Sequence, residues 1–321
     1  MLEQKDLFHG VLLNPSTRPG INRLLIVSGF ATAGMADRHM EHLQKMSKAI
    51  SIELIVGMTR RSGIEKAQHY AFRKMAKECP YGMDFSCRYV GRGNPVHAKT
   101  YCWMKGDEPC VAFVGSANYT LTAFGREQIE SVVEADQRGV MSFHRETRRN
   151  TVDCNDEDVE QKIALTETRS AEDDDDSESV TLSLLDKRTG DPPAKSGINW
   201  GQRPNRDPNE AYINIPANIG RSGFFPERSE QFTVLTDDGD SFIMVRAQDA
   251  GKGIETTQNN SLLGRYLRTR IGVKSGEYVT RQHLVEYGRT NVTFRKIDEE
   301  TYEMDFRPNM GPGEDAEGWQ K

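Results

Sequence analysis

The sequence lacks the features of a membrane protein, a secreted protein or a disulfide-stabilised protein. No apolar run approaches the roughly 18 residues that a membrane span requires, and residues 1–22 contain no signal-peptide core. The five cysteines form an odd set without any C-x-x-C spacing, which argues against a disulfide framework or a zinc knuckle. These absences predict a soluble, cytoplasmic protein that has no membrane partner and keeps its thiols reduced.

The charge of the chain is unevenly distributed. The formal net charge is −6, yet residues 1–150 contain 21 basic and 15 acidic side chains. Residues 151–180 contain 2 basic and 12 acidic side chains, so the acidity is concentrated in one short segment. The average charge therefore does not exclude a nucleic-acid partner, because the basic N-terminal part can still attract phosphates.

The N-terminal part has the pattern of an α/β layered domain. Apolar runs of buried-strand type cover Arg23–Ser28 and Ile52–Gly57, and a stretch with helical spacing separates them. Because 321 residues exceed the usual size of one domain, we expect this domain to end near residue 150. Its helices are predicted at Ala36–Ile50 and Gly63–Cys79, and its later strands at Phe85–Val90, Val96–Trp103, Cys110–Val114 and Glu130–Ala135.

The remaining residues divide into a predicted acidic linker, 151–194, and a second domain, 195–321. The acidic run at 172–178 cannot bury enough apolar area to fold alone, so we interpret the linker as a solvated tether. The alternative is a regulatory DNA mimic that shields basic surfaces. Frequent turn residues in 195–321 predict a mostly β pseudobarrel, with strands at Tyr212–Ile215, Phe232–Thr236, Phe242–Ala247, Asn291–Ile297 and Tyr302–Phe306, and helices at Ser261–Ile271 and Arg281–Tyr287.

The most informative motif is His97-x-Lys99, which is followed by Gly115-Ser116-Ala117-Asn118. If Val96–Trp103 is a strand, its side chains alternate between faces, so His97 and Lys99 should point the same way. The small-residue turn after the next strand should present Ser116 and Asn118 where a ligand can approach the backbone. An imidazole nucleophile, a cationic clamp and a hydroxyl and amide pair predict phosphate chemistry. The alternative is an exposed strand-end histidine beside an unrelated Gly-Ser turn.

These residues resemble the HKD motif of the phospholipase D superfamily. The resemblance implies that His97 attacks phosphorus and that Lys99 and Asn118 hold the non-bridging oxygens. Ser116 would join them in stabilising the charge on phosphorus, and Glu130 corresponds best to the family glutamate. The predicted catalytic residues are therefore His97, Lys99, Ser116, Asn118 and Glu130, with no metal ligand among them.

Two features depart from that motif or compete with it. Met104 stands five residues after Lys99, where the family usually has an aspartate, and the nearest acid is Asp107. We interpret Asp107 as a turn residue without a catalytic role. His39 and His42 lie three residues apart on an expected helix and could imitate a metal pair, but nothing nearby completes the site. They are therefore interpreted as part of a solvated face.

The C-terminal part resembles the plant B-three-type DNA-binding pseudobarrel, through Ser241–Arg246 and Leu263–Arg268. That domain type grips the DNA major groove with two arms, which fall here at Asn199–Asn209 and Arg246–Lys252. Their side-chain types can read base edges, although ordinary turn chemistry is the alternative for any one of them. The expected DNA-binding residues are Trp200, Gln202, Arg203, Arg206, Asn209, Arg246, Gln248, Asp249, Lys252, Asn259 and Asn260. Arg265 and Arg268 look more like phosphate contacts or surface charges.

An α/β phospholipase D-like nuclease domain joined to a B-three-like domain resembles the NgoFVII family of bacterial restriction endonucleases, and more distantly the BfiI-type enzymes. The resemblance implies a type II restriction endonuclease that is sequence-specific for double-stranded DNA. It would hydrolyse phosphodiester bonds without a metal, through a phosphohistidine intermediate. Because the chain has one HKD motif and the reaction needs a nucleophile and an acid, the resemblance also implies a homodimer.

The family also suggests further partners and a kind of target. Relatives suggest a short GC-rich recognition site and a cognate DNA methyltransferase. Some relatives depend on an ATP-driven translocase, which would have to be a separate polypeptide here because this chain has no P-loop. Two other functions compete with this one: a DNA-binding regulator with a degenerate nuclease domain, and a phospholipid phosphodiesterase.

Overall fold

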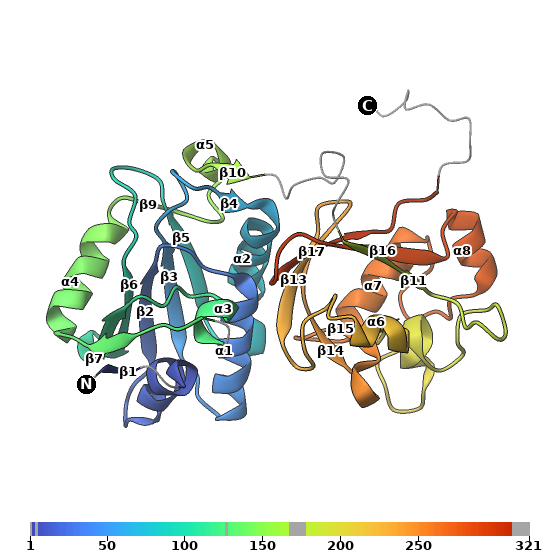
Figure 1. The fold of residues 1–321 in the computed structure, drawn as a ribbon, viewed down its shortest axis with the longest axis horizontal. Helices are drawn as coiled ribbons and strands as arrows, with labels where there is room; N and C mark the ends of the chain where they lie inside the picture. The colour runs from blue at the N-terminus through green and yellow to red at the C-terminus, as the bar shows by residue number, and fades with distance from the viewer. Residues whose placement is uncertain (1, 4–5, 126–127, 167–177, 310–321) are drawn as a thin grey trace.

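The structure is a computed structural model, and it describes residues 2–3, 6–125, 128–166 and 178–309. Two large sheets organise these residues into two domains that lie side by side (Figure 1). The first domain is an α/β layered domain and the second is a mostly β pseudobarrel, so the predicted fold classes are confirmed.

The first domain is built on an eight-stranded mixed sheet in the order β1-β8-β7-β6-β2-β3-β5-β9. The central strands β2, β3 and β5 run parallel, while β6, β7, β8 and β1 continue the sheet as antiparallel strands. The strands are β1 (Leu2–Glu3), β2 (Arg23–Ser28), β3 (Ser51–Val56), β5 (Phe85–Val90), β6 (Lys99–Lys105), β7 (Glu108–Gly115), β8 (Val132–Glu134) and β9 (Thr151–Asp153).

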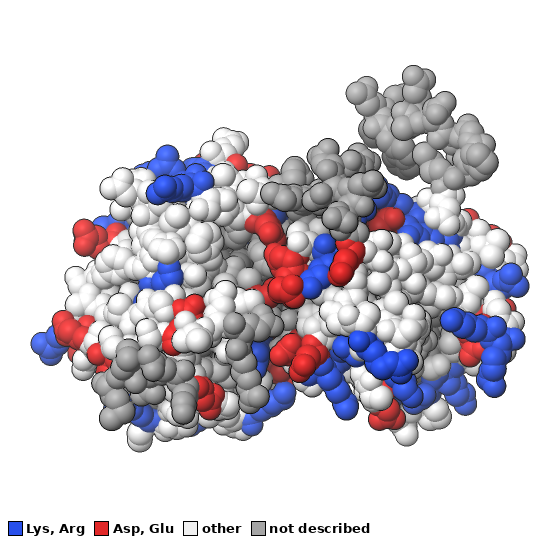
Figure 2. All heavy atoms as spheres, viewed as in Figure 1, with Lys and Arg blue, Asp and Glu red and all other residues white. Residues whose placement is uncertain are grey.

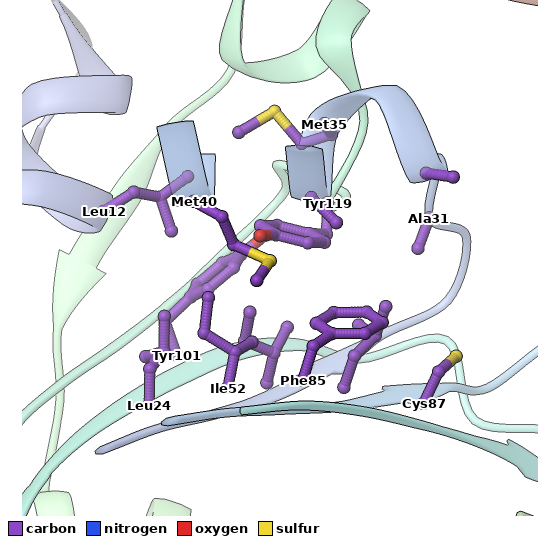
Figure 3. Packing of buried hydrophobic residues seen from close by; sticks show 14 of the residues in the cluster. Leu12, Leu24, Ala31, Met35, Met40, Ile52, Phe85, Cys87, Tyr101 and Tyr119 are labelled. Atoms are coloured by element: carbon purple, nitrogen blue, oxygen red, sulfur yellow. The ribbon is translucent and has the colours of Figure 1, made fainter. Parts of the chain in front are cut away.

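Helices cover both faces of this sheet, which explains why β2 and β3 are apolar along most of their length. On one face lie α1 (Ala33–Lys45) and α2 (Lys66–Glu78), and on the other α4 (Gln137–Arg148) (Figure 1). Leu24 and Ile52 of the sheet pack with Met40 of α1 in the main core (Figure 3). Leu25 packs with Val140 of α4 in a smaller core on the opposite face. The short helix α3 (Leu121–Phe124) follows β7.

The second domain is a seven-stranded sheet in the order β11-β16-β17-β13-β14-β15-β12. Its edge strands β11 and β12 come into contact, so the sheet nearly closes on itself as a pseudobarrel. The strands are β11 (Ser179–Ser183), β12 (Ile213–Asn214), β13 (Gln231–Thr236), β14 (Ser241–Ala247), β15 (Gly253–Thr256), β16 (Asn291–Lys296) and β17 (Thr301–Asp305). The helices are α6 (Ala217–Arg221), α7 (Ser261–Arg270) and α8 (Arg281–Tyr287).

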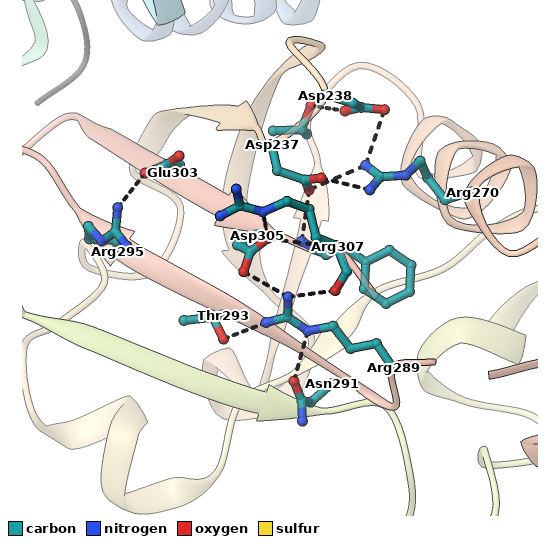
Figure 4. A network of polar contacts seen from close by, with 12 residues as sticks. Asp237, Asp238, Arg270, Arg289, Asn291, Thr293, Arg295, Glu303, Asp305 and Arg307 are labelled. Carbon is teal, nitrogen blue, oxygen red and sulfur yellow. Dashed lines mark hydrogen bonds and ion pairs between the residues drawn. The ribbon is translucent and has the colours of Figure 1, made fainter. Parts of the chain in front are cut away.

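A polar network fastens the helices of the second domain to its strand ends (Figure 4). Arg270, at the end of α7, pairs with Asp237 at 2.7 Å and with Asp238 at 3.1 Å. Arg289, just after α8, is 6% exposed and pairs with Asp305 of β17 at 2.7 Å. Because each buried guanidinium has a carboxylate partner, these arginines stabilise the fold and are not free to bind a ligand.

The predicted linker of residues 151–194 is too long. Strand β9 pairs with β5 at Thr151–Asp153, and α5 (Val159–Lys162) and β10 (Leu165–Thr166) follow it in the first domain. Strand β10 pairs with β4 (Ile64–Glu65), and β11 pairs with β16 of the second domain. The charge count misled the prediction, because apolar residues between the acids supply the contacts that order these strands. The acidic run at 172–178 lies almost wholly outside the described residues.

The two domains contact each other through α1 and α2 on one side and β13 and β14 on the other (Figure 1). Ile243 of β14 joins the apolar core of the first domain. Polar contacts surround it: Lys74 pairs with Asp240 at 3.0 Å, and Gln258 donates to Asp37 at 3.2 Å. Burial raises the pKa of Asp37 to about 6. The contact is therefore specific but largely polar.

A cleft of about 1310 Å³ lies between the domains and reaches Glu130. Its walls come from α1 and the segment around α3 in the first domain, and from residues 223–231, 245–247 and 255–257 in the second. Acidic side chains outnumber basic ones along these walls, and Figure 2 shows acidic residues gathered where the two domains meet. Among the described residues, no helix is long and apolar enough to cross a membrane.

Candidate functional site

His97 and Lys99 meet at the start of β6, although not in the way that a continuous strand would bring them together. Strand β6 begins at Lys99, which lies opposite Ser28, the last residue of β2. Residues 96–98 therefore lack a neighbouring strand, and the Val96 N–H donates instead to the carbonyl of Gly57 at 3.0 Å. The predicted strand start at Val96 is wrong by three residues. The Lys99 Nζ nevertheless lies 3.1 Å from His97 Nε2 and donates to the His97 carbonyl at 2.8 Å.

Burial and charge distinguish these two side chains. Lys99 is 6% exposed, and burial lowers the pKa of its ammonium group, while the nearby Glu130 carboxylate opposes that shift. His97 is exposed, and its ring meets Phe30 edge-on with the ring centroids 5.9 Å apart. The site thus combines an accessible imidazole with a buried ammonium group.

Asn118 lies beside them on the loop after β7. Its Oδ1 accepts a hydrogen bond from the Phe30 N–H at 3.1 Å, which fixes the orientation of the amide. Gly29 separates Asn118 from His97: a Cβ built on Gly29 would lie 2.9 Å from His97 Cδ2 and 3.4 Å from Asn118 Oδ1. Because glycine has no side chain, the His97 imidazole and the Asn118 amide can both lie close to the backbone of residue 29.

Ser116 and Glu130 complete the group. The Ser116 hydroxyl donates to Glu130 Oε2 and accepts from the Ser131 N–H at 3.0 Å. Since Glu130 also acts on the pKa of Lys99, its carboxylate is close to the cation. The structure brings all five predicted catalytic residues to one end of the sheet. Their roles in a reaction stay a prediction.

Several residues that support this loop were missed by the sequence reasoning. Tyr101 donates from its hydroxyl to the Ala117 carbonyl at 2.8 Å, and Ser28 accepts from the Tyr119 N–H at 2.9 Å. The Tyr119 hydroxyl bonds to His39 Nδ1 at 2.9 Å, and His39 Nε2 donates to the Leu12 carbonyl at 2.7 Å. Only the apolar context of Tyr101 and Tyr119 in the sequence hinted that they are buried.

These contacts correct the interpretation of His39 as part of a solvated face. Its side chain is fully buried, and burial lowers the pKa of its imidazole to about 4. His39 is therefore a neutral hydrogen-bonding residue beneath the loop that carries Asn118. His42, one helical turn later, is half-buried and bonds to the Arg38 carbonyl at 2.8 Å.

Met104 and several ionisable residues of the first domain lie away from this group. Met104 is fully buried in the core against α4, and Asp107 lies in the β6–β7 turn, at the opposite end of β6 from Lys99. His144 is buried on α4 beside Glu53 at 3.7 Å. Within the described ranges, no three or more His, Cys, Asp or Glu side chains form a group that could hold a metal ion.

In the second domain, predicted DNA-binding residues from both arms make internal contacts. Trp200 and Asn209 are buried, and the Asn209 Oδ1 accepts from the Gly276 N–H at 2.6 Å. Gln202 donates to the Pro208 and Gly276 carbonyls, both at 3.1 Å. Arg246 donates to the Pro226 and Gly220 carbonyls at 3.1 and 3.0 Å. These contacts give all four side chains a structural role within the domain, and their part in DNA binding stays a prediction.

The other arm residues present polar atoms at or near the surface. Arg203, Asp249, Lys252 and Asn259 are exposed, while Arg206, Gln248 and Asn260 are partly or fully open to solvent. Arg206 stacks over the Trp200 ring at 3.8 Å and pairs with Glu210. Gln248 donates to Glu255 at 2.6 Å, and both Arg206 and Glu210 act electrostatically on Glu255. The two predicted arms are therefore neighbours in space.

Arg268 corrects another expectation. Its side chain is 1% exposed, and its guanidinium donates to the carbonyls of Glu277, Gly264 and Ile198. It is a structural residue and not a phosphate contact or a surface charge. Arg265 is exposed, as expected, and lies 3.3 Å from Asp207.

Comparisons with known structures find weak resemblances that span about half of this chain. They include polyphosphate kinase from Porphyromonas gingivalis (11% identity, TM-score 0.33, covering 49% of this chain and 25% of that one). They also include NucT from Helicobacter pylori (14% identity, TM-score 0.31, covering 48% of this chain and 97% of that one). A third is a phospholipase D family member, Nuc from Salmonella typhimurium (15% identity, TM-score 0.28, covering 42% of this chain and 83% of that one). A comparison with curated proteins finds no match.

Comparisons with family models are more informative, because two models together match most of the chain. Residues 5–161 match the NgoFVII restriction endonuclease N-terminal PLD domain, where PLD denotes phospholipase D. Residues 173–298 match the NgoFVII C-terminal B3-like DNA-binding domain. The two matches follow the two domains of the fold in the same order. The chain therefore belongs to the NgoFVII restriction endonuclease family, with a phospholipase D-like nuclease domain followed by a B3-like DNA-binding domain.

Proposed function

We propose that this protein is a sequence-specific, type II restriction endonuclease that hydrolyses DNA phosphodiester bonds through a phosphohistidine intermediate and without a metal ion. The observation that carries the proposal is the meeting of His97, Lys99, Ser116, Asn118 and Glu130 at one end of the first sheet. An accessible imidazole can attack phosphorus, and the ammonium, hydroxyl and amide groups beside it can stabilise the added charge.

In the first step, the neutral imidazole of His97 forms a P–N bond while the bond from phosphorus to the 3′ oxygen breaks. The leaving oxygen takes a proton from a general acid. In the second step, the group that gave this proton takes one from water, the water oxygen attacks phosphorus, the P–N bond breaks, and the product carries a 5′ phosphate. Lys99 lies 3.1 Å from His97 Nε2, so a phosphoryl oxygen that enters the site would replace His97 as a partner of the ammonium group.

The acid in this scheme would be His97 of a second copy, because each chain has one HKD motif. A two-fold dimer places identical patches against each other and could bring two imidazoles to one phosphate. Large apolar side chains exposed around the site support this dimer: Phe30 is 38% exposed, Val133 39% and Ile129 98%. Light scattering of the full chain should report the mass of a dimer, and an active monomer would contradict the scheme.

The test of the proposed chemistry is plasmid cleavage in excess EDTA. We expect the rate to stay within about twofold of the rate without chelator, because the nucleophile is an imidazole and the charged groups around it are organic. Sequencing of the cut ends from both reactions would show whether the same sites are used. If cleavage stops on chelation and returns with magnesium, the metal-independent mechanism is wrong for this protein.

The B3-like domain would select the DNA sequence through the outward-facing arm residues. We expect alanine at Arg203, Arg206, Gln248 or Asp249 each to cost about 1–3 kcal/mol of binding at one base position, because these side chains can pair with base edges. Alanine at the exposed Arg265 should weaken binding to all sequences alike and reduce the dependence on salt. Binding to single-base variants at fixed ionic strength separates the two outcomes, and a uniform loss in the arm variants would show that the arms are misplaced.

Two other functions predict different results. A DNA-binding regulator with a degenerate nuclease domain would bind DNA without cutting it, and a phospholipid phosphodiesterase would release lipid headgroups. The presence of His97, Lys99 and Asn118 together argues against the first alternative, and the B3-like DNA-binding domain argues against the second. A short GC-rich target, a cognate methyltransferase and a separate ATP-driven translocase are further proposals from the family relationship, and sequencing of cut ends with and without ATP and a translocase would test the first and the last.

A further inference from the structure

Glu300, in the turn before β17, ties the second domain to the loops that carry the active site. Its side chain belongs to the second domain but is 7% exposed, because it enters the first domain. Its carboxylate accepts three hydrogen bonds there: from the Thr32 hydroxyl at 2.6 Å, the Leu121 N–H at 3.1 Å and the Thr122 N–H at 2.7 Å. Both of its oxygens are used.

The donors lie where two segments that build the site end: Thr32 at the end of the loop after β2, and Leu121 and Thr122 at the start of α3, directly after the loop that follows β7. Two hydrogen bonds join these segments to each other, and both lie between Glu300 and the proposed catalytic group. The Thr32 N–H donates to the Tyr119 carbonyl at 3.0 Å, and the Phe30 N–H donates to Asn118 Oδ1 at 3.1 Å. Glu300 therefore binds both segments on one side, while Asn118 lies on the other side and Gly29 and Phe30 contact His97 there.

The second domain holds Glu300 itself in place. The Glu300 N–H donates to Asp298 Oδ1 at 2.7 Å, and its carbonyl accepts from the Thr233 N–H of β13 at 2.8 Å. Burial raises the pKa of the Glu300 carboxyl, which means that the charged form is held in the interface at a cost. When the domains separate, the carboxylate exchanges these three donors for water, so the contact exists only in the docked arrangement.

A second contact follows at the next residue. Gln68 of α2 donates to the Thr301 hydroxyl at 3.2 Å, and its Oε1 accepts from the Ala33 N–H at 2.7 Å. Ala33 follows Thr32 in the chain, so Thr301 reaches the same segment indirectly, through Gln68. The contact is therefore directed at the loop after β2 and not only at the helix surfaces.

We propose that Glu300 is a positioning residue for catalysis: the DNA-binding domain uses it to hold the Thr32 and Leu121–Thr122 segments, and through them Asn118 and the His97 site, in their working geometry. The proposal rests on the proposed nuclease function. It makes the DNA-binding domain part of the catalytic machinery as well as the reader of the sequence. Docking of that domain would then be needed for fast cleavage, even where DNA is already bound.

The test compares Glu300→Gln and Thr32→Val with the wild-type full chain. A glutamine has the same size but replaces one acceptor oxygen with a donor, so at least one of the three donors loses its partner. We expect the single-turnover cleavage rate at saturating DNA to fall by about 10- to 100-fold in Glu300→Gln, since small displacements in an active site have effects of this order. Thr32→Val removes one donor from the other side of the contact and should lower the rate in the same direction. DNA binding, measured in a His97→Ala background that leaves DNA intact, should change less than about twofold.

Lys74→Met is the matched control, because it removes an interdomain contact that does not touch the catalytic loops. Lys74 of α2 pairs with Asp240 and donates to the Ser241 carbonyl, both at 3.0 Å. If Glu300 merely helps to dock the domains, Lys74→Met should slow cleavage to a similar extent. We expect the control to keep the wild-type rate within about twofold.

Hydrogen exchange provides a measurement that does not depend on activity. The amides of Leu121 and Thr122 should exchange at least about tenfold faster in Glu300→Gln than in wild type or Lys74→Met, because their acceptor is lost. Wild-type protein that cuts no DNA would contradict the nuclease function, while the exchange rates would still report on the contact. Unchanged cleavage rates in both Glu300→Gln and Thr32→Val, or equal losses in Lys74→Met, would overturn the proposal.

Discussion

Replacing His97 with alanine is expected to abolish DNA cleavage by this protein while leaving DNA binding nearly unchanged. The imidazole is the proposed nucleophile, and removing the nucleophile of a covalent mechanism lowers turnover by roughly 10⁴-fold or more. Binding should persist because the arms that would read DNA belong to the other domain. Lys99→Ala and Asn118→Ala should give the same pattern, since both remove groups that stabilise charge on phosphorus.

A gel-shift assay and a cleavage assay on the same preparations measure the two effects. His9→Ala is a suitable control, because His9 is an exposed histidine of the same domain that bonds to Asp6 at 2.7 Å and lies outside the catalytic group. This control should keep both binding and cleavage. Loss of binding in His97→Ala with retained cleavage would contradict the assignment of His97 as the nucleophile.

Adding a single methyl group at Gly29 is expected to lower the cleavage rate by about 100-fold without unfolding the protein. The new Cβ would lie 2.9 Å from His97 Cδ2, closer than real Cβ contacts, so the imidazole must move. It would also lie 3.4 Å from Asn118 Oδ1. A displacement of the nucleophile by a fraction of an ångström to 1 Å is enough to produce a loss of this size.

Single-turnover rates and thermal unfolding of Gly29→Ala measure catalysis and stability separately. Gly220→Ala is the matched control, because it adds the same methyl group on helix α6, where the nearest atom would be at 3.5 Å. The control should keep the wild-type rate. Full activity in Gly29→Ala would mean that the contact between Gly29 and the imidazole does not hold the working position of His97.

Much of the fold could be predicted because the spacing of apolar residues along the sequence indicates which positions are buried. Arg23–Ser28 and Phe85–Val90 were predicted with their observed bounds. The first is a nearly continuous apolar run, typical of a strand covered on both faces, and the second alternates apolar with polar residues. The start of β6 was misplaced because it depends on the neighbouring strand. Strand β6 runs antiparallel to β2 and begins opposite Ser28, where β2 ends, and residues 96–98 carry no information about that position. The linker was overestimated for a related reason, since the partner of β11 lies more than 100 residues away at β16.

The candidate catalytic group was predicted from local spacing, but the residues that support it were not. His97, Lys99, Ser116 and Asn118 form a motif that can be recognised along the chain, whereas Ser28 and Tyr119 act together across 91 positions. His39 was misjudged because its partners, Tyr119 and the Leu12 carbonyl, come from segments on either side of its helix. The contacts of Arg246 and Arg268 could not be predicted for the same reason, because their guanidinium groups donate to backbone carbonyls from other segments of the domain.

The sequence by itself determined the two fold classes, the order of the domains and the side chains available for chemistry at phosphorus. These properties depend on residue types at short spacings, because periodic apolar residues specify strands and helices and the motif brings its own functional groups. Only the tertiary structure decided which arginines and asparagines are free to meet a ligand, and how the second domain contacts the catalytic loops through Glu300. The reason is physical: a polar side chain has the same sequence signature whether its partner is solvent, DNA or a backbone group from a distant part of the chain, and only folding chooses that partner.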